Sequence, residues 1–398
     1  MPADHLGRRE FLRRVAGTGA ATCVGLAAGS LLTVPGGAQE APQPAPAPPP
    51  AAPTPPPPPG ARYFGPKTAA GEIPCLLCPR GCKIKPGARG ECQAYLHATD
   101  GTLQSLSYGK VAKWMVEPVE TDHFFHVLPG APAFFFGAPT CNLNCSYCSE
   151  WKLSQFPVEQ VPNQPADPKA LVAQAQAAGV KLLGSTYTDP AASLEYALDI
   201  ASAAREAGLY PIAHTGGYLM PGPMRDLASA LVALNIDLKA YSDANYKTLC
   251  RGSLQPALDA IKAARDTRVW LEITYLVVPG YNDSPSLIKD MCRWIVENCG
   301  PATPVHFVGF FPRYKHRQLQ TPSTDPQTLK SFRETAYEAG LLFAYVGNLP
   351  GDTGECTLCP HCHAFLLRRV GTSVSAVDFD ALRGFCTKCF TAIPGVWH

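Results

Sequence analysis

The amino-acid sequence predicts an α/β fold, in which a full or partial parallel (β/α) barrel carries small cysteine-rich modules at both ends. The first observation behind this prediction is the alternation of short apolar runs with helix-like segments between residues 131 and 350. The second is that Gly179, Gly208 and Gly340 lie where helices of this pattern should end. Repeated βα units imply a parallel sheet, and about six or seven of them imply a full or partial barrel.

The strands and helices of this barrel are expected in strict alternation. Buried strands are expected at residues 133–137, 180–183, 210–214, 236–239, 269–277, 304–308 and 342–346. Helices are expected at residues 168–178, 191–207, 224–234, 254–264, 284–297 and 326–339. In a barrel of this kind the active residues lie at the carboxyl ends of the strands, so the loops that follow the strands are the place to look for chemistry.

Three cysteines follow the first expected strand directly. Cys141, Cys145 and Cys148 have the spacing C-x3-C-x2-C, with Tyr147 just before the last of them. Three thiolates on one loop can ligate three irons of a [4Fe-4S] cluster and leave the fourth iron open to an outside ligand. The alternatives are a zinc knuckle or buried free thiols. Zinc sites usually take four ligands from paired C-x2-C units, whereas this loop supplies three, so we favour the cluster.

The spacing of this loop resembles the cluster loop of radical S-adenosylmethionine (SAM) enzymes. The resemblance implies that the open iron binds the amino and carboxylate groups of SAM. It also implies that the reduced cluster splits SAM into methionine and a 5′-deoxyadenosyl radical, with electrons from a donor such as a ferredoxin or flavodoxin.

Several polar residues on the expected strands suit SAM as a ligand. Asp189 can accept from the amino group, Lys239 can pair with the carboxylate, and Asp237 can take the ribose hydroxyls. The ring of Tyr147 can face the adenine, and His306 on the sixth strand completes the expected SAM-binding set. The alternative is that some of them are structural polar groups satisfied inside the barrel.

A more specific resemblance is to the pyruvate formate-lyase activating enzyme group, and within it to the AmmeMemoRadiSam system radical SAM enzymes. It covers roughly residues 75–398 and rests on a set of short motifs. These are C-L-L-C-P-R-G-C at 75–82, G-E-C at 90–92, the cluster loop, N-I-D-L-K at 235–239, P-G-Y-N-D at 279–283, P-V-H at 304–306 and Y-V-G-N at 345–348. The chain departs from the family pattern at Thr188 and Asp189, where Asn and Glu are usual, and at Gly216, where Asn is usual.

Two further cysteine groups flank the barrel. The first comprises Cys75, Cys78, Cys82 and Cys92, and four thiolates suit either zinc or a closed [4Fe-4S] cluster, a choice that spacing leaves open. The second comprises Cys359, Cys362, Cys386 and Cys389, whose paired C-x2-C units favour tetrahedral zinc over an auxiliary iron–sulfur cluster or disulfides. Cys356 and His363 are spare potential ligands, and Cys250, Cys292 and Cys299 are expected to be isolated or buried thiols.

Composition supports metal rather than disulfides, and it excludes a nucleic-acid partner. The 16 cysteines gather in metal-like spacings within a chain of 398 residues, and the net charge is only +2. We therefore divide the chain into a signal (1–38), a proline-rich linker (39–66), an N-terminal cysteine-rich module (67–130), the barrel (131–350) and a zinc-ribbon-like module (351–398).

The first residues match a twin-arginine export signal. Arg8 and Arg9 lie in G-R-R-E-F-L-R, and a mildly apolar segment follows at 15–34 with small residues at 36–38. We expect the twin-arginine translocase as a partner and a periplasmic or membrane-tethered location, with the cytoplasm as the alternative. This pathway moves folded proteins, which suits a chain that receives its cluster inside the cell, although SAM is also made there.

Two functions of different classes follow. The first is a radical SAM enzyme of unknown substrate, with hydrogen abstraction from a protein glycine, as in activating enzymes, as one form. The second is a non-catalytic, exported iron–sulfur or electron-transfer protein on the same scaffold.

Overall fold

The computed structural model describes residues 60–371 and 373–398. The described residues belong to one compact unit, and residues 1–59 lie outside the described part of the chain. The expected twin-arginine signal and all but the end of the proline-rich linker therefore lie outside the described residues. In the part that is described, no helix is both long enough and apolar enough to cross a membrane.

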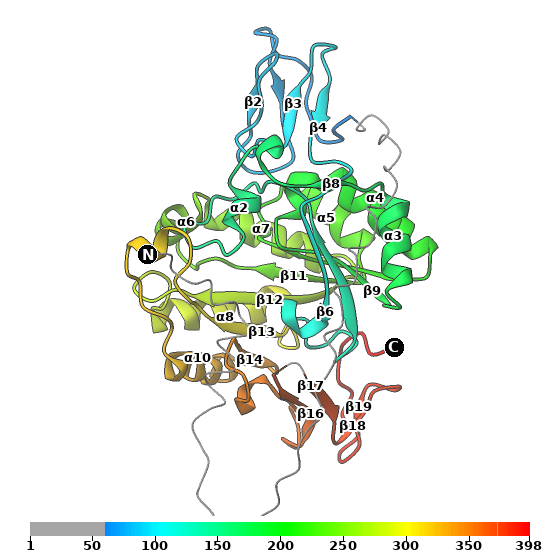
Figure 1. Cartoon of the computed structure of the whole chain (residues 1–398). Helices are drawn as coiled ribbons and strands as arrows, with labels where there is room; N and C mark the ends of the chain where they lie inside the picture. Colours follow the sequence, from blue (N-terminus) through cyan, green and yellow to red (C-terminus); the bar gives the residue numbers. More distant parts are fainter. Residues whose placement is uncertain (1–59, 372) are drawn as a thin grey trace, which may run out of the picture. The chain divides into compact units, whose positions relative to one another are not determined.

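An eight-stranded sheet forms the centre of the fold, in the order β14-β13-β12-β11-β10-β9-β7-β6 (Figure 1). Neighbouring strands from β7 to β14 are parallel, and β6 is antiparallel to β7. The sheet has two edges, β6 and β14, so the expected barrel is the partial form. Its strands are β6 (Lys113–Pro118), β7 (Pro132–Gly137), β9 (Leu182–Ser185), β10 (Tyr210–Thr215), β11 (Ala233–Asp237), β12 (Trp270–Val277), β13 (Val305–Gly309) and β14 (Ala344–Gly347).

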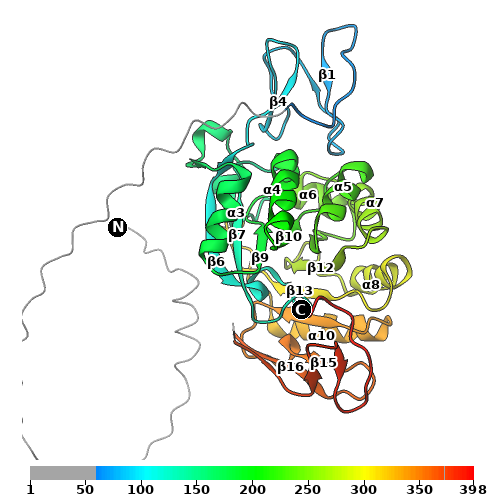
Figure 2. The same cartoon turned by 90° about the vertical axis from the view of Figure 1, so that its right-hand side faces the viewer.

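Helices connect successive strands and pack along the outside of the sheet (Figure 2). Asp167 and Asp325 cap the first turns of their helices with side-chain hydrogen bonds to Ala170 N and Thr328 N. The connecting helices are α3 (Pro168–Ala177), α4 (Leu194–Glu206), α5 (Pro221–Ala230), α6 (Asp243–Cys250), α7 (Leu254–Arg265), α8 (Pro285–Cys299) and α10 (Pro326–Glu338).

Two expected elements lie earlier in the chain than predicted. The helix expected at 224–234 is α5, which begins at Pro221, and the strand expected at 236–239 is β11, which begins at Ala233. Proline in the first turn starts α5 early, and the extended backbone of Leu231 ends it. Strand β6 and helix α6 were not predicted. Every residue of β6 is exposed or half-buried, so the apolar pattern of a barrel strand is absent there.

The connection from β6 to β7 enters the sheet from the amino ends of the parallel strands. It contains the short helix η1 (Val119–Asp122) and is held by Glu272 of β12. The Glu272 carboxylate accepts hydrogen bonds from Phe125 N (3.0 Å), His126 N (2.9 Å) and the Trp270 indole (3.1 Å). A buried carboxylate with this many donors is a structural anchor.

The two small modules contact opposite ends of the barrel strands. The N-terminal module has β1 (Ile73–Pro74), β2 (Lys83–Ile84), β3 (Tyr95–His97) and β4 (Leu103–Ser105), and the Met220 amide, beyond the carboxyl end of β10, donates to Leu77 O. The C-terminal module contains β15 (Thr357–Leu358), β16 (Phe365–Val370), β17 (Ser373–Ala376), β18 (Phe379–Asp380) and β19 (Phe385–Cys386). Its buried Arg369 donates to Phe125 O at the amino ends of the strands.

Candidate active site

The cluster loop with Cys141, Cys145 and Cys148 leaves the carboxyl end of β7 and rests on the last turn of α6. The Asn144 amide donates to Cys250 O (3.1 Å), and the Ser146 amide donates to Leu249 O (2.8 Å). These backbone bonds fix the loop on a helix that the sequence did not predict. The loop therefore stands at the end of the barrel where the expected SAM-binding side chains converge.

Local donors surround the sulfurs of this loop. The Leu143 amide donates to Cys141 Sγ (3.4 Å), and Cys148 Sγ lies 3.3 Å from Ser154 Oγ. Burial raises the pKa of Cys148 to about 11, while the Ser154 hydroxyl and the Lys239 ammonium oppose that rise. Thiols must lose their protons to ligate iron, and donors that face sulfur favour the charged form. The donor set thus fits a [4Fe-4S] cluster.

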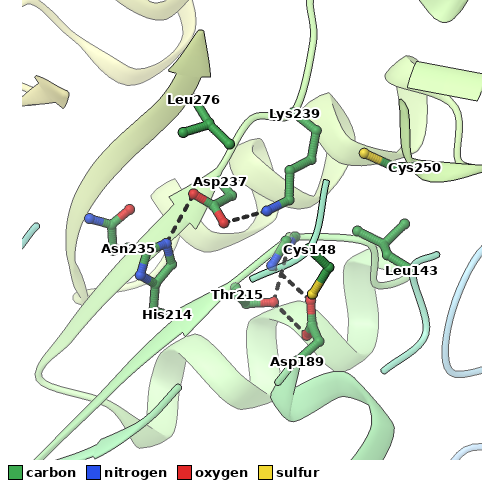
Figure 3. Close-up of polar contacts among 12 residues, drawn as sticks. Leu143, Cys148, Asp189, His214, Thr215, Asn235, Asp237, Lys239, Cys250 and Leu276 are labelled. Atoms are coloured by element: carbon green, nitrogen blue, oxygen red, sulfur yellow. Dashed lines mark hydrogen bonds and ion pairs between the residues drawn. The ribbon is translucent and has the colours of Figure 1, made fainter. Parts of the chain in front are cut away.

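A chain of charged side chains crosses the barrel interior beneath the loop. The Asp237 carboxylate pairs with the Lys239 ammonium, and its other oxygen lies 3.1 Å from His214 Nε2 (Figure 3). His214 Nδ1 in turn lies 3.6 Å from a carboxylate oxygen of Asp122 in η1. The chain therefore runs from the amino-end connection to the strand ends that face the cluster loop.

The charges in this chain stabilise one another. Burial alone would lower the pKa of His214, but the Asp237 and Asp122 carboxylates raise it to about 10. Burial alone would raise the pKa of Asp237, but Lys239 and His214 hold it well below its usual range. Lys239 likewise stays protonated, because Asp237 outweighs the burial that would lower its pKa. At neutral pH all three groups are charged.

Asp189 is a buried carboxylate at the end of β9. Its oxygens accept from Ala191 N (3.0 Å), Thr215 Oγ1 (2.8 Å) and Gly216 N (2.7 Å). A carboxylate offers about four acceptor positions, so these donors leave one. Asp189 also lies near Cys141, whose pKa is raised first by burial and then by the Asp189 charge.

Because Gly216 has no side chain, Leu143 and Asp189 can pack closely against its backbone. A Cβ atom there would lie 2.7 Å from Leu143 Cδ1 of the cluster loop and 3.0 Å from Asp189 Oδ2. The asparagine that is usual in the resembling family would therefore not fit without a shift. The departures at Asp189 and Gly216 belong together, because the Asp189 carboxylate that bonds to Gly216 N occupies the space beside the missing Cβ atom.

Tyr147 and Cys250 form a buried contact behind the cluster loop. The Tyr147 hydroxyl lies 3.5 Å from Cys250 Sγ, and its ring packs against Phe310 and His316. Burial would raise the pKa of Cys250, but a hydrogen bond from Cys145 and the Lys239 charge lower it. Cys250 is thus a site residue that the sequence did not identify. A single cysteine in a helix carries no spacing signal.

Other motif residues shape the site without facing the loop. The Asn282 amide donates to Lys239 O (2.9 Å) and Leu276 O (2.9 Å), and its oxygen accepts from Val278 N (2.6 Å). Asn282 therefore joins the loop after β12 to the backbone of Lys239, which explains the P-G-Y-N-D motif. Asn348 similarly donates to Gly309 O (3.0 Å) across the ends of β13 and β14.

His306 lies in the same row of the sheet as Asp237, because both residues pair with Thr274 of β12. It is the second residue of β13, fully buried, and its Nε2 lies 2.7 Å from Glu272 Oε2. Its ring contacts Phe125 and Tyr345, neither of which belongs to the cluster loop. These contacts favour a structural role for His306 in holding the amino-end connection.

The C-terminal cysteines come together as a compact group. The sulfurs of Cys359, Cys362, Cys386 and Cys389 all lie within 4.8 Å of one another, with pairs at 3.5 Å and 3.6 Å. Four zinc–sulfur bonds of about 2.3 Å place tetrahedral ligands about 3.8 Å apart, so the geometry fits one zinc ion. Cys356 is not in the group; its sulfur accepts from Arg369 N (3.4 Å).

A polar cavity of about 480 Å³ lies elsewhere, lined by residues that include Arg205, Arg268, Trp270 and Val396. Trp270 begins β12, so this cavity opens at the amino ends of the strands, away from the cluster loop. It takes no part in the site described above.

Comparisons with known proteins identify the family. A family model described as the radical SAM superfamily matches residues 137–291. An uncharacterized protein of Methanocaldococcus jannaschii is 34% identical over 318 residues, which make up 80% of this chain and 94% of that protein.

Two solved structures are similar at lower levels. A domain of pyruvate-formate lyase-activating enzyme from Bacteroides vulgatus has 15% identity and a TM-score of 0.34, covering 39% of this chain and 91% of that chain. A radical SAM methyltransferase from Sphaerobacter thermophilus has 15% identity and a TM-score of 0.43, covering 56% of this chain and 70% of that chain.

Proposed function

Because the chain belongs to the radical SAM superfamily, we propose that it abstracts hydrogen from a substrate at the carboxyl ends of its barrel strands. Membership implies a [4Fe-4S] cluster, SAM and an electron donor. A [4Fe-4S] cluster held by Cys141, Cys145 and Cys148 would supply one-electron reductive chemistry for the cleavage of bound SAM to methionine and a 5′-deoxyadenosyl radical. The observation that carries the proposal is the placement of Lys239 beside the cluster-loop thiols, where its charge acts on Cys145 and Cys148.

Different residues of the chain would bind the cluster and SAM. Cys141, Cys145 and Cys148 would hold the cluster, since they share one buried loop with sulfur-facing donors. Lys239 and Asp237 present a cation and a carboxylate at one strand end, which suits the carboxylate and the ribose diol of SAM. Asp189 keeps one acceptor position for an ammonium group.

We extend the proposal to a polypeptide substrate, as in activating enzymes. Strand β6 is an edge of the sheet, and its residues Trp114, Met115 and Val116 are exposed. An exposed apolar edge strand can pair with an extended peptide. The strand begins close to the site, because Lys113 pairs with Glu150 (2.7 Å), which closely follows the cluster loop. Membership of the AmmeMemoRadiSam branch remains a prediction from sequence motifs.

The test is anaerobic incubation of the reconstituted full chain with SAM and dithionite. Formation of methionine and 5′-deoxyadenosine is expected, and a Cys148→Ala variant gives the background. Adding a deuterated protein extract should place deuterium in the 5′-deoxyadenosine, whereas the small-molecule fraction of the same extract should not. The reverse result would remove the polypeptide substrate while leaving the enzyme class intact.

A non-catalytic electron-transfer protein is the second candidate, and one observation favours it. Asp237 and Lys239 already satisfy each other, and Asp189 already holds three hydrogen bonds, so these groups are stable without SAM. A protein with an intact cluster that reduces and reoxidises but yields no 5′-deoxyadenosine would establish this reading.

A further inference from the structure

The cysteines of the N-terminal module are brought together by a β-hairpin and a following turn. The Cys75 amide donates to Cys82 O (2.8 Å) beside the β1–β2 pair, and the Gly81 amide donates to Cys78 O (3.1 Å) in the turn between them. A Cβ atom on Gly90 would lie 3.8 Å from Cys82 Sγ, so the turn that leads to Cys92 passes directly over the hairpin.

The four thiols lie within electrostatic reach of one another. Burial raises the pKa of Cys92 to about 12, and the charges of Cys78, Cys75 and Cys82 add to that rise. Burial likewise raises the pKa of Cys75 to about 12, with contributions from Cys78 and Cys82.

The spacing of these sulfurs differs from that of the C-terminal group. Among the described residues, only Cys359, Cys362, Cys386 and Cys389 have all their ligand atoms within 4.8 Å of one another. One zinc ion needs such close sulfurs, because every ligand touches the same centre. A [4Fe-4S] cluster attaches each thiolate to a different iron and so requires sulfurs that are further apart.

The surroundings of the four thiols suit a cluster that is partly shielded from water, since Cys75 and Cys78 are buried and Cys82 and Cys92 are half-buried. Leu77, Ile84, Ala94 and Tyr95 are buried around them in the main core of the protein, which also includes Leu143 of the cluster loop. Shielding of this kind is one of the properties that set the potential of an iron–sulfur cluster.

Asn142 links this group directly to the cluster loop. It follows Cys141, and its carbonyl accepts from Arg80 Nε (2.6 Å) of the hairpin turn. The Asn142 side-chain amide donates to Tyr218 O (2.7 Å). One residue of the C-x3-C-x2-C motif therefore joins the cluster loop to the hairpin turn between Cys78 and Cys82.

We propose that Cys75, Cys78, Cys82 and Cys92 ligate a second, closed [4Fe-4S] cluster that relays electrons to the cluster loop. The cluster accepts one electron from an external low-potential one-electron carrier protein and is oxidised again when it passes that electron to the cluster on Cys141, Cys145 and Cys148. The relay rests on the function proposed above, whereas the metal site stands independently of it.

The metal site is tested by counting metals in the anaerobically reconstituted full chain. About eight irons and one zinc per chain are expected, from two clusters and one tetrahedral site. A Cys78→Ser/Cys92→Ser variant should retain about four irons and the zinc. Cys292 is a buried cysteine of α8 outside the proposed site, so Cys292→Ser is the matched control and should keep all eight irons.

Two outcomes would overturn the site. A wild-type chain with about four irons and two zincs would make the N-terminal group a zinc site. A double variant that keeps about eight irons would show that these cysteines are not ligands. The wild-type count needs no variant, so it decides the question even if the double variant folds poorly.

The relay is tested by comparing two reductants and by spectroscopy. In the double variant, SAM cleavage driven by a flavodoxin should fall at least ten-fold, while cleavage driven by dithionite, a small reductant that reaches either site, should persist. The reduced wild type should show electron paramagnetic resonance signals broadened by spin coupling, and the variant should show a single uncoupled cluster. Equal loss with both reductants, or an uncoupled wild-type spectrum, would refute the relay. Absence of SAM cleavage in the wild type would instead refute the proposed function.

Discussion

The Lys239 ammonium pairs with the Asp237 carboxylate two residues before it, and Leu238 between them is buried on the opposite side. Alternation of side chains at a strand end makes this pairing possible. Because the pair faces the cluster loop, a ligand with a carboxylate and a ribose diol meets both charges at once.

Replacing Lys239 with methionine should weaken SAM binding by ten-fold or more. Loss of a charge-assisted contact at a buried site costs roughly 1.5–3 kcal/mol. Calorimetry with the reconstituted protein measures the affinity directly. Lys247→Met on α6, where the side chain is exposed and pairs with Asp243, is the control and should bind as the wild type does. Affinity unchanged in Lys239→Met would refute the assignment.

Removing Cys141, Cys145 and Cys148 together should cost about four irons per chain, the content of one cluster. Cys250→Ala is the informative control, because this thiol lies beside Cys145 without belonging to the motif. The iron content of Cys250→Ala should match that of the wild type, although the Tyr147 hydroxyl loses its contact with the Cys250 sulfur. Loss of iron in Cys250→Ala would make Cys250 a ligand and would close the iron that SAM needs.

His214 should make the stability of the fold depend on pH above neutrality. Its pKa is raised from 6.5 to about 10 by Asp237 and Asp122 against the opposing effect of burial. The folded protein therefore holds a proton that the unfolded chain loses, and the stabilisation is fully present below pH 6.5 and is lost as pH rises to about 10.

Denaturant unfolding of the wild type and His214→Gln between these limits measures this dependence. The wild-type free energy of unfolding should fall relative to the variant by at most about 1.4 kcal/mol per pH unit. If the free energies of unfolding of wild type and variant change with pH in the same way throughout that range, His214 is not protonated in the folded protein.

The C-terminal cysteines should bind about one zinc per chain in the whole protein. Cys386→Ser should lose that zinc and lower the melting temperature, because Cys359 and Cys386 share a buried core with Phe125, Phe343 and Tyr345 next to the barrel. Cys356→Ser is the control and should keep the zinc, since its sulfur is bonded to Arg369 instead. Iron in place of zinc would indicate an auxiliary cluster.

We propose export by the twin-arginine route, which rests on Arg8 and Arg9 in the part of the chain outside the described residues. Changing both to lysine keeps the charge but alters the group that the receptor reads, so export should stop. Cell fractionation should then find the precursor inside with its leader uncleaved. Equal export of wild type and variant would contradict the signal.

The sequence by itself determined the parallel α/β architecture, the position of the cluster loop and the composition of the C-terminal cysteine group. Each of these is a local pattern. Apolar runs that alternate with helix-like segments specify βα units, and short cysteine spacings specify which thiols can meet. Asp237 and Lys239 were also identified in this way, because the carboxyl ends of parallel strands meet at one edge.

Only the tertiary structure decided which polar groups face that edge. The fold also gives His306 a bond to Glu272, the carboxylate that holds the connection from β6 to β7, and nothing in the sequence indicated this bond. Cys250 and Asp122 entered the site although no motif marks them, because α6 and η1 are brought to the barrel by long-range contacts. Strand β6 was missed because an exposed edge needs no apolar pattern.

The contact between the N-terminal hairpin and the cluster loop was likewise decided by the fold. Cys78 and Asn142 are far apart in sequence, and only the docking of the hairpin on the strand ends brings them together. Sequence spacing specifies ligands within one loop, whereas the distance between two loops depends on how their scaffolds pack. The physical reason is that side-chain direction and burial are set by the whole sheet and the elements that fill it, not by neighbours along the chain.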